Sequence, residues 1–355
     1  MKPFKKILVV FENQSDNRAL IEQAIDLAQK NQAALTVIDV IEKSPQDFSR
    51  PAKKHPGDRH TQIPIIEEFL PDASLSTRTQ APMKEVKDVA GHSEKRTIDI
   101  LEYVKQEEQR DLQKFVTTIQ QAGIQTASKT IVGVPFIEII REVLQNQYDL
   151  VMMTAEGKSG LKQTLLGNTS LHLMRKCPCP VWVIKPGQPN HNRRILAAVD
   201  LVPDDKERIA LARKIMDLAT SLARLGHDQL LILHAWSLFG ESILRGRAGV
   251  SDEEIENLLI EAKTSHRDCL TELLENIPLD EIKFEVYLLK GNAGTLIPEF
   301  AQAKAVDLIV MGTLSRTGIA GFFIGNTAEK VLQQVDCSIL AVKPEGFVSP
   351  VKINT

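Results

Sequence analysis

Apolar residues follow two spacings along this chain, one typical of buried strands and one typical of helices. Residues 7–11 form a continuous apolar run, as does a strand buried on both faces of a sheet. Apolar positions at helical spacing come next, at Leu20, Ile21, Ala24, Ile25, Leu27 and Ala28. Residues 35–41 predict a second strand, and further strands are expected near 127–132 and 149–153. This alternation predicts an α/β fold with a parallel sheet covered by helices on both faces.

Two longer helices are also predicted, one in each half of the chain. Apolar residues at helical spacing between 98 and 119 predict the first. The second is clearer, because Ser251 and Glu254 have the spacing of a capping box at a helix start. Its core stripe consists of Ile255, Leu258, Leu259, Ala262, Cys269, Leu270, Leu273 and Leu274. In parallel sheets, ligands bind beyond the carboxyl ends of the strands, so residues just after strands are the functional candidates.

The second half of the sequence repeats the first. Residues 6–12 match 194–200 at an offset of 188. Three later blocks match at a constant offset of 158, namely 149–153 with 307–311, 167–169 with 325–327, and 181–186 with 339–344. A constant offset across separated blocks indicates a duplicated domain. The change of offset places extra residues in the first copy, within the polar stretch 43–94.

The repeat predicts two domains joined by a short linker. The first copy covers residues 1–186 and carries the insertion 43–94, the linker is 187–193, the second copy is 194–345, and 346–355 form a C-terminal tail. The insertion has little periodicity, which favours a flexible surface segment over a partner-docking segment. We therefore expect its removal to leave folding intact.

Composition narrows the function classes. The chain has 355 residues, of which 43% are hydrophobic and 25% charged, as in ordinary globular proteins. A net charge of −3 gives no basic footprint for direct nucleic-acid binding. The apolar runs are too short for a signal peptide or a membrane span, so no membrane association is expected. Four cysteines without a secretion signal favour a reducing compartment, and we expect a cytoplasmic protein.

The candidate chemistry lies after the fourth strand of each copy. In the second copy, Gly312 and Gly325 flank a stretch of small residues in which the backbone can approach a phosphate closely. Gly325 leads into a helix whose start offers unpaired amides to an anion. Asn326 and Glu329 have the spacing of a capping box there, and Arg316 adds positive charge.

This stretch resembles the universal stress proteins, whose ATP-binding members carry Gly, two residues, Gly, nine residues, Gly, then Ser or Thr. The second copy has Gly312, Ser315 in place of the second glycine, and Gly325 followed by Asn326. Thr327 stands one residue later and can supply the hydroxyl instead.

The first copy departs from the same pattern differently. It has Thr154 in place of the first glycine, Gly157 as the second, and Gly167 followed by Asn168, with Thr169 as the later hydroxyl. The family also places an aspartate after the first strand, where it holds the ribose or adenine. Asp200 matches it in the second copy, whereas Glu12 replaces it in the first. The resemblance further implies an adenine beside the backbone of Val40 and Ala235, in pockets lined by Met153 and Met311.

The resemblance covers both repeats and implies five-stranded parallel sheets. Members of this family pair through their last strands, which here are 181–184 and 339–342. We therefore expect these strands to pair antiparallel and form an internal pseudo-dimer. The Gly-Asn-Thr motifs and the closing residues 345–351 are similar to the tandem members of the E type in particular. The family implies a signalling or protective role under stress, with ATP or another adenine nucleotide as the expected ligand, bound more tightly by the second copy.

Plainer interpretations stay open beside this one. The glycines can be simple turn residues and Asp200 a helix cap, which would leave an interaction scaffold with empty pockets; a slow ATP hydrolase is a third hypothesis. Cys177 and Cys179 form only half a metal site, so thiols in the core are expected and no metal. His234 is expected to be packed or capping rather than a catalytic base, and His172 to lie on the surface, with a phosphate contact as the alternative. No nucleophile–base motif appears, and we expect no catalytic residues and no enzyme.

Overall fold

The structure is a computed structural model that describes residues 3–13, 15–42, 106–107, 109–155, 167–187, 193–246, 250–313 and 324–353. The predicted insertion 43–94 lies outside these residues, as does most of the predicted linker. Of the helix expected at 98–119, the described part is helical from 109 to 121. Within the described ranges, no helix combines the length and the apolar character needed to cross a membrane.

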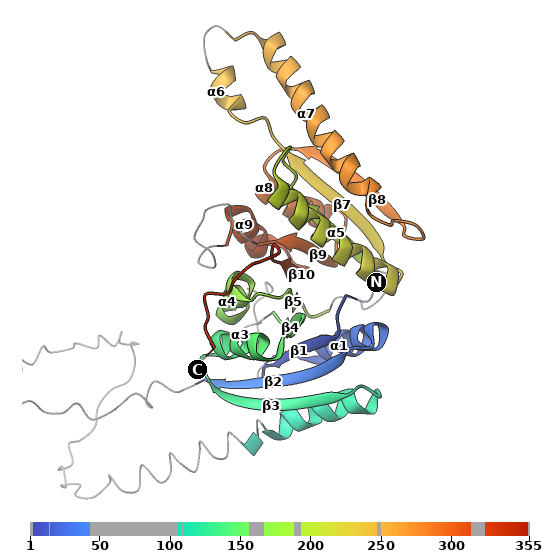
Figure 1. The fold of residues 1–355 in the computed structure, drawn as a ribbon, viewed down its shortest axis with the longest axis vertical. Helices are drawn as coiled ribbons and strands as arrows, with labels where there is room; N and C mark the ends of the chain where they lie inside the picture. The colour runs from blue at the N-terminus through green and yellow to red at the C-terminus, as the bar shows by residue number, and fades with distance from the viewer. Residues whose placement is uncertain are drawn as a thin grey trace, which may run out of the picture. The chain divides into compact units, whose positions relative to one another are not determined.

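The first copy alternates strands and helices as its sequence predicts (Figure 1). Its elements are β1 (Lys6–Phe11), α1 (Arg18–Asn31), β2 (Ala34–Glu42), the helical residues 109–121, β3 (Thr126–Gly133), α3 (Pro135–Asn146), β4 (Leu150–Thr154), α4 (Asn168–Lys176) and β5 (Val181–Ile184). The strands expected at 35–41, 127–132 and 149–153 are therefore confirmed to within one residue at each end.

The second copy repeats this order and adds a short helix. Its elements are β6 (Arg194–Val199), α5 (Lys206–Gly226), β7 (Gln229–Trp236), α6 (Glu241–Arg245), α7 (Asp252–Glu275), β8 (Phe284–Lys290), α8 (Ala293–Ala303), β9 (Leu308–Gly312), α9 (Asn326–Gln334) and β10 (Ser338–Val342). The capping box predicted at the start of α7 is present, with Ser251 and Glu254 each bonding to the other's backbone. The sequence pattern had not indicated α6.

The strands of both copies join into one ten-stranded sheet in the described part of the chain, in the order β3-β2-β1-β4-β5-β10-β9-β6-β7-β8. Neighbouring strands are parallel within each copy, and β5 pairs with β10 antiparallel, with Trp182 opposite Leu340. The predicted pairing of the two last strands is thus confirmed. Both strands are fully buried, so the contact removes two apolar sheet edges from water.

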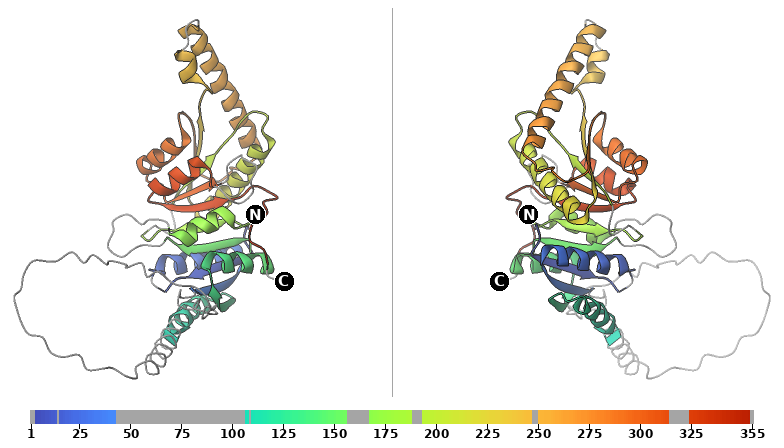
Figure 2. Two further views of the ribbon diagram at one scale, coloured as in Figure 1. Left: turned by 90° about the vertical axis from the view of Figure 1, so that its left-hand side faces the viewer. Right: turned by 90° about the vertical axis from the view of Figure 1, so that its right-hand side faces the viewer.

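Each face of the sheet carries one apolar cluster that runs through both copies. One cluster packs α1, the helix containing Phe115, α5 and α7 onto the sheet, and the other packs α3, α4, α8 and α9 onto the opposite face (Figure 2). This arrangement follows from right-handed crossovers, because the helices after the first two strands of each copy return on one face and those after the next two strands on the other.

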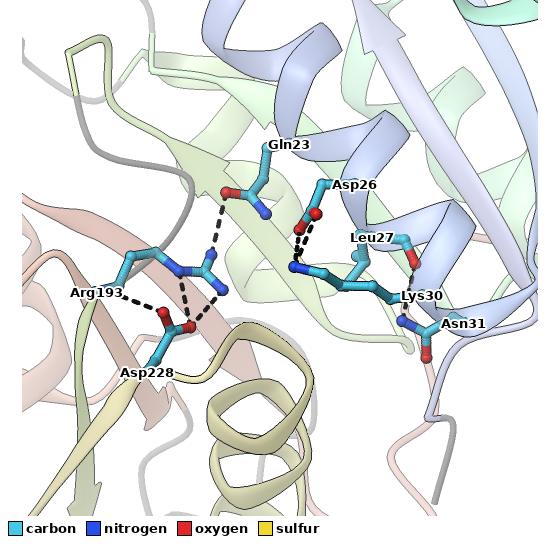
Figure 3. Close-up of polar contacts among 7 residues, drawn as sticks. All are labelled: Gln23, Asp26, Leu27, Lys30, Asn31, Arg193 and Asp228. Carbon is cyan, nitrogen blue, oxygen red and sulfur yellow. Dashed lines mark hydrogen bonds and ion pairs between the residues drawn. The ribbon is translucent and has the colours of Figure 1, made fainter. Parts of the chain in front are cut away.

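Polar contacts also join the copies. Arg193, the last residue of the predicted linker, is buried and forms an ion pair with the buried Asp228, with 2.7 Å between Nη2 and Oδ2. Its Nη1 donates to Oε1 of Gln23 on α1 at 3.0 Å (Figure 3). The linker therefore ends in an anchored residue.

A buried lysine follows the last strand of each copy and reaches the end of a helix in the other. Lys185 donates from Nζ to the Val335 carbonyl after α9 at 2.5 Å, and Lys343 donates to the Met174 carbonyl in α4. A cation is favoured there because carbonyls without helical partners give the C-terminus a negative partial charge. Burial lowers the pKa of Lys343 to about 7.

The predicted C-terminal tail contacts the first copy. The Lys352 carbonyl accepts from Nε of Arg141 on α3 at 3.3 Å, and Val351 packs against the core cluster on that face. The tail thus adds to the contact between the copies.

Candidate functional site

Strand register brings the candidate residues of the second copy to one edge of the sheet. Ala198 of β6 lies opposite Met311 of β9, and Val199 lies opposite His234 of β7. Asp200 follows β6 directly, so it stands between the ends of β7 and β9. This is the topological switch point, where the chain leaves β6 on one side and returns to β9 on the other.

Asp200 is exposed and paired. Its side chain is 70% exposed, and Oδ2 accepts from Nη1 of Arg208 on α5 at 2.7 Å. Arg208 also lies 3.2 Å from the Asp205 carboxylate. The carboxylate is thus held at the edge of the site, although the expected ribose contact would share it with Arg208.

Gly312 ends β9 next to the side chain of Leu211. A Cβ at this position would lie 2.8 Å from Cδ2 of Leu211 on α5. The next residue, Thr313, is buried and donates from Oγ1 to the Met174 carbonyl of the first copy at 2.9 Å. The end of β9 is therefore fixed from both copies.

The helix α9 begins without a side-chain cap. Gly325 is the N-cap residue in an extended conformation, and its N–H donates to the Thr313 carbonyl at 3.1 Å. The predicted capping box between Asn326 and Glu329 is wrong, because Asn326 is already the first helical residue and its side chain cannot occupy the cap position. The first-turn amides of α9 therefore start next to the end of β9. Asn326 and Thr327 are exposed.

The remaining residues predicted for this site do not all lie at the exposed edge of the sheet. Ser315 and Arg316 lie outside the described residues. Ala235 is half-buried on β7, between His234 and Trp236. Met311 is buried in the core cluster against α8 and α9 rather than at the exposed edge.

The first copy has the same framework with different side chains. Glu12 accepts a hydrogen bond from Oγ of Ser15 at 3.0 Å. Thr154 is buried, and its hydroxyl has no hydrogen-bond partner among the described residues. Gly167 is the extended N-cap of α4, again without a side-chain cap, and is followed by the exposed Asn168 and the half-buried Thr169. Val40 is half-buried and Met153 is fully buried, both within the core cluster on the α3 face, while Gly157 lies outside the described residues.

One residue beside each site occupies the same place in the two copies, and the sequence analysis did not recognise this correspondence. His234 lies opposite Val199 in the second copy, and Asp39 lies opposite Phe11 at the matching place in the first. Both are buried. Aligning β2 with β7 could have revealed the exchange, whereas no local pattern marks His266 of α7, whose ring lies against His234.

His234 is packed and hydrogen-bonded, as its sequence position led us to expect. Its Nδ1 lies 3.2 Å from the Val199 carbonyl, and burial lowers its pKa below the ordinary value. His172 is only partly on the surface, because it stacks on Phe136 with 4.2 Å between ring centroids. Burial, followed by Lys176 and Arg175, lowers the pKa of His172.

Three of the four cysteines are buried in the core, and Cys269 on α7 is half-buried. Cys177 and Cys179 are buried with their Sγ atoms 3.6 Å apart, and both are free thiols. Burial raises the pKa of Cys337 to about 12. Within the described ranges, no group of three His, Cys, Asp or Glu side chains could hold a metal ion.

Two shallow clefts in the second copy lie away from the predicted site. One is lined by residues such as Arg224, His227 and Lys283, and the other by 274–280 and Phe284. Both lie at the amino ends of β7 and β8, whereas Asp200, Gly312 and Gly325 lie at the carboxyl edge of the sheet. We therefore keep the carboxyl edge as the candidate site.

The sequence profile of the Universal stress protein family matches residues 3–185 and 191–343. The chain belongs to the universal stress protein family. The two matched ranges give one domain of the family to each copy, which makes this a tandem universal stress protein.

Curated relatives agree with this membership. The chain is 30% identical to Universal stress protein E of Escherichia coli (strain K12) over 221 residues, which cover 62% of this chain and 68% of the relative. It is 30% identical over 221 residues to Universal stress protein E of Salmonella typhi, covering 62% of this chain and 69% of that one. The tandem E-type resemblance is therefore confirmed.

Solved structures support the fold. A protein of unknown function from Pseudomonas aeruginosa PAO1 superposes with a TM-score of 0.62 at 22% identity, covering 98% of this chain and 95% of that one. A universal stress protein from Archaeoglobus fulgidus DSM 4304 gives a TM-score of 0.58 at 16% identity, covering 95% and 98%.

Proposed function

We propose that this universal stress protein binds an adenine nucleotide or a related phosphorylated ligand, mainly in its second copy, and acts in stress signalling or protection rather than as an efficient enzyme. The observation that carries the proposal is the meeting of three features at one edge. A carboxylate follows β6, a glycine packed beside Leu211 ends β9, and the side-chain-uncapped start of α9 lies beside it.

These features suit the two ends of a nucleotide. The first-turn amides of a helix attract an anion, with a contribution of about 0.3–1 kcal/mol or more when partly buried. A carboxylate accepts hydrogen bonds from ribose hydroxyls. The pair between Asp200 and Arg208 does not prevent this, because exposed ion pairs contribute only about 0–1 kcal/mol and a ligand hydroxyl can compete.

The first copy is the weaker candidate. Glu12 is longer by one methylene and accepts a bond from Ser15, while Thr154 places a side chain where Gly312 has none. The buried Asp39 adds a second carboxyl group near the same edge, which opposes a bound phosphate when it is ionised. Its side-chain-uncapped α4 start resembles that of α9, so we propose weak rather than absent binding there.

The test begins with freshly purified protein. Ligands released from it are identified by mass spectrometry, and MgATP and adenosine are then titrated calorimetrically. We expect MgATP to bind at least about ten-fold more tightly than adenosine, because only ATP reaches the start of α9. Absence of released nucleotide, together with no heat at millimolar MgATP, would leave the scaffold hypothesis in its place. Phosphate release above a buffer control would instead favour slow hydrolysis.

A further inference from the structure

Two histidines lie beside the backbone on either side of Asp200. His234 of β7 bonds through Nδ1 to the carbonyl of Val199 at 3.2 Å, one residue before the aspartate. His266 of α7 lies near the backbone of Leu201, one residue after the aspartate, and this backbone favours the protonated form of His266. The two rings also bond to each other, with 2.9 Å between His234 Nε2 and His266 Nδ1 and 5.0 Å between ring centroids.

The protons of this chain of bonds can be assigned from its acceptors. A carbonyl only accepts, so Nδ1 of His234 carries a hydrogen. In neutral His234, Nε2 is then a lone pair, and it accepts from Nδ1–H of His266. A proton added to His266 at its other nitrogen leaves this bond intact. A proton added to His234 Nε2 breaks it, because two N–H groups would then face each other.

The surroundings favour the unprotonated state of His234. The ring is 1% exposed, and the strand neighbours opposite it, Val199 on β6 and Leu288 on β8, are apolar. Burial lowers the pKa of both histidines, and His266 lowers that of His234 further. Asp200 raises both pKa values, although its carboxylate is already paired with Arg208 of α5.

The bond between two histidine rings is a feature of the second copy. Asp39 occupies the place of His234 in the first copy. An aspartate has no imidazole ring, so the ring-to-ring bond of the second copy has no counterpart at Asp39. The histidine pair thus accompanies Asp200, the residue expected to contact the ligand.

We propose that His234 and His266 are positioning residues for Asp200, and that ligand capture by the second copy is lost when His234 takes up a proton from solvent. This inference rests on the proposed function. It predicts binding at neutral and alkaline pH and loss of binding in acid, once the bond between the rings is broken.

The first experiment needs no ligand. The full chain is labelled with ¹⁵N-histidine, and the imidazole signals are followed by NMR from pH 8 to pH 4.5. Of the 8 histidines, we expect His234 and His266 to carry their hydrogen on Nδ1 when neutral and to titrate below the ordinary value of about 6.5. In His266→Gln one of these two signals is removed and that of His234 should shift, whereas the control His227→Asn, at an exposed helix C-cap, should leave both unchanged.

The second experiment measures MgATP affinity over the same pH range. Gln at position 266 can donate to neutral His234 or accept from its protonated form, so His266→Gln should retain affinity at pH 7.5. His266→Leu should lower it several-fold at that pH. In acid, wild type should lose at least about ten-fold more affinity than His266→Gln. The nucleotide's own phosphate titrates in this range, and the comparison with His266→Gln in the same buffers removes that contribution.

The outcomes separate this inference from the proposed function. An equal loss of affinity in acid for wild type and His266→Gln, with binding intact at pH 7.5, would overturn the positioning role and leave nucleotide binding standing. Independent titration of the two rings would also overturn it. Coupled titration in wild type without any nucleotide binding would instead refute nucleotide binding, and with it the regulation of ligand capture, while leaving the histidine bond itself in place.

Discussion

In the first copy, a lysine on β3 and a glutamate on α3 form an ion pair, whereas the same two places in the second copy hold aromatic rings. Lys129 lies 2.7 Å from the nearly buried Glu142. Tyr287 and Phe300, which follow at the offset of 158, contact edge to face with 4.7 Å between ring centroids. One strand–helix contact is thus stabilised by charge in one copy and by packing in the other, so the fold does not depend on either chemistry.

The two copies also differ where the strands end. Glu12, Asp39 and Thr154 in the first copy correspond to Asp200, His234 and Gly312 in the second. By contrast, one contact between the copies is shared, since Lys185 and Lys343 each cap a helix of the other copy. The duplication has kept this lysine contact and changed the chemistry of the edge, as expected if one pocket binds and the other supports.

The largest expected effect concerns the contact between the copies, where the second copy has the buried Arg193 and the first copy has the exposed Lys5 at the matching place. Arg193→Met should lower the free energy of unfolding by about 3–5 kcal/mol, because Asp228 is left charged and buried. Lys5 is the matching residue of the first copy and is exposed, so the control Lys5→Met should change it by less than about 0.5 kcal/mol. Urea titrations followed by circular dichroism measure both, and equal losses would contradict this difference.

Replacing Gly312 by threonine, the residue at the matching place in the first copy, tests how well the end of β9 accepts a side chain. Gly312→Thr should cost no more than about 1 kcal/mol of stability, because the new Cβ meets only the end of the flexible, half-buried Leu211 side chain. In a Leu211→Ala background, Gly312→Thr should lower stability by less than it does in wild type. Thermal unfolding of the single and double variants gives the comparison, and a fully additive double variant would show that the contact is not the cause.

The difference in stability between wild type and Lys343→Met should depend on pH. Its pKa in the folded protein is about 7, whereas the unfolded chain keeps the ordinary value near 10.4. Between these values the unfolded state binds more protons, so wild-type stability should rise with pH relative to Lys343→Met, by about 1 kcal/mol from pH 7 to pH 8. Below pH 7 the difference should level off. Urea titrations at pH 6, 7 and 8 measure it, and a constant difference at all three would contradict the lowered pKa.

A similarly small effect tests whether charge and packing are interchangeable on the outer strand. Lys129→Met should cost about 1 kcal/mol, because Glu142 loses its partner but keeps the bond from Asn146 at 2.8 Å. Replacing the pair by that of the second copy, Lys129→Tyr with Glu142→Phe, should restore stability to within about 1 kcal/mol of wild type. A double variant less stable than Lys129→Met would show that the ion pair is specifically required.

The fold could be predicted from the sequence because its signals are local and repeated. The strand expected at 149–153 is Leu150–Thr154 in the structure, since a buried run has few alternatives. The capping boxes show the limit of such reasoning. Ser251 and Asn326 have equal spacing to a glutamate, yet only Ser251 stands in the extended residue before its helix. Spacing alone does not say which residue is the cap.

The candidate site was harder to predict because its parts come from separate elements. The residues after the strands were found because both copies resemble the glycine motif and the aspartate position of one family. His266 was not, because it lies 32 residues after His234 on a helix whose pattern reports only its buried stripe. Arg193 lay in an expected linker, and its contact with Gln23 spans 170 residues. Such contacts depend on how helices pack, which a single sequence does not encode locally.

The difference between the pockets is tested most directly by titrating MgATP into wild type, Asp200→Ala and Glu12→Ala in one buffer at pH 7.5. Loss of a hydrogen bond that leaves a polar partner unsatisfied costs about 1–3 kcal/mol, or about ten-fold or more in affinity. Asp200→Ala should therefore weaken binding by at least about ten-fold, and Glu12→Ala should change it by less than about two-fold. If Glu12→Ala abolishes binding while Asp200→Ala leaves it intact, the functional pocket is in the first copy and this account is wrong.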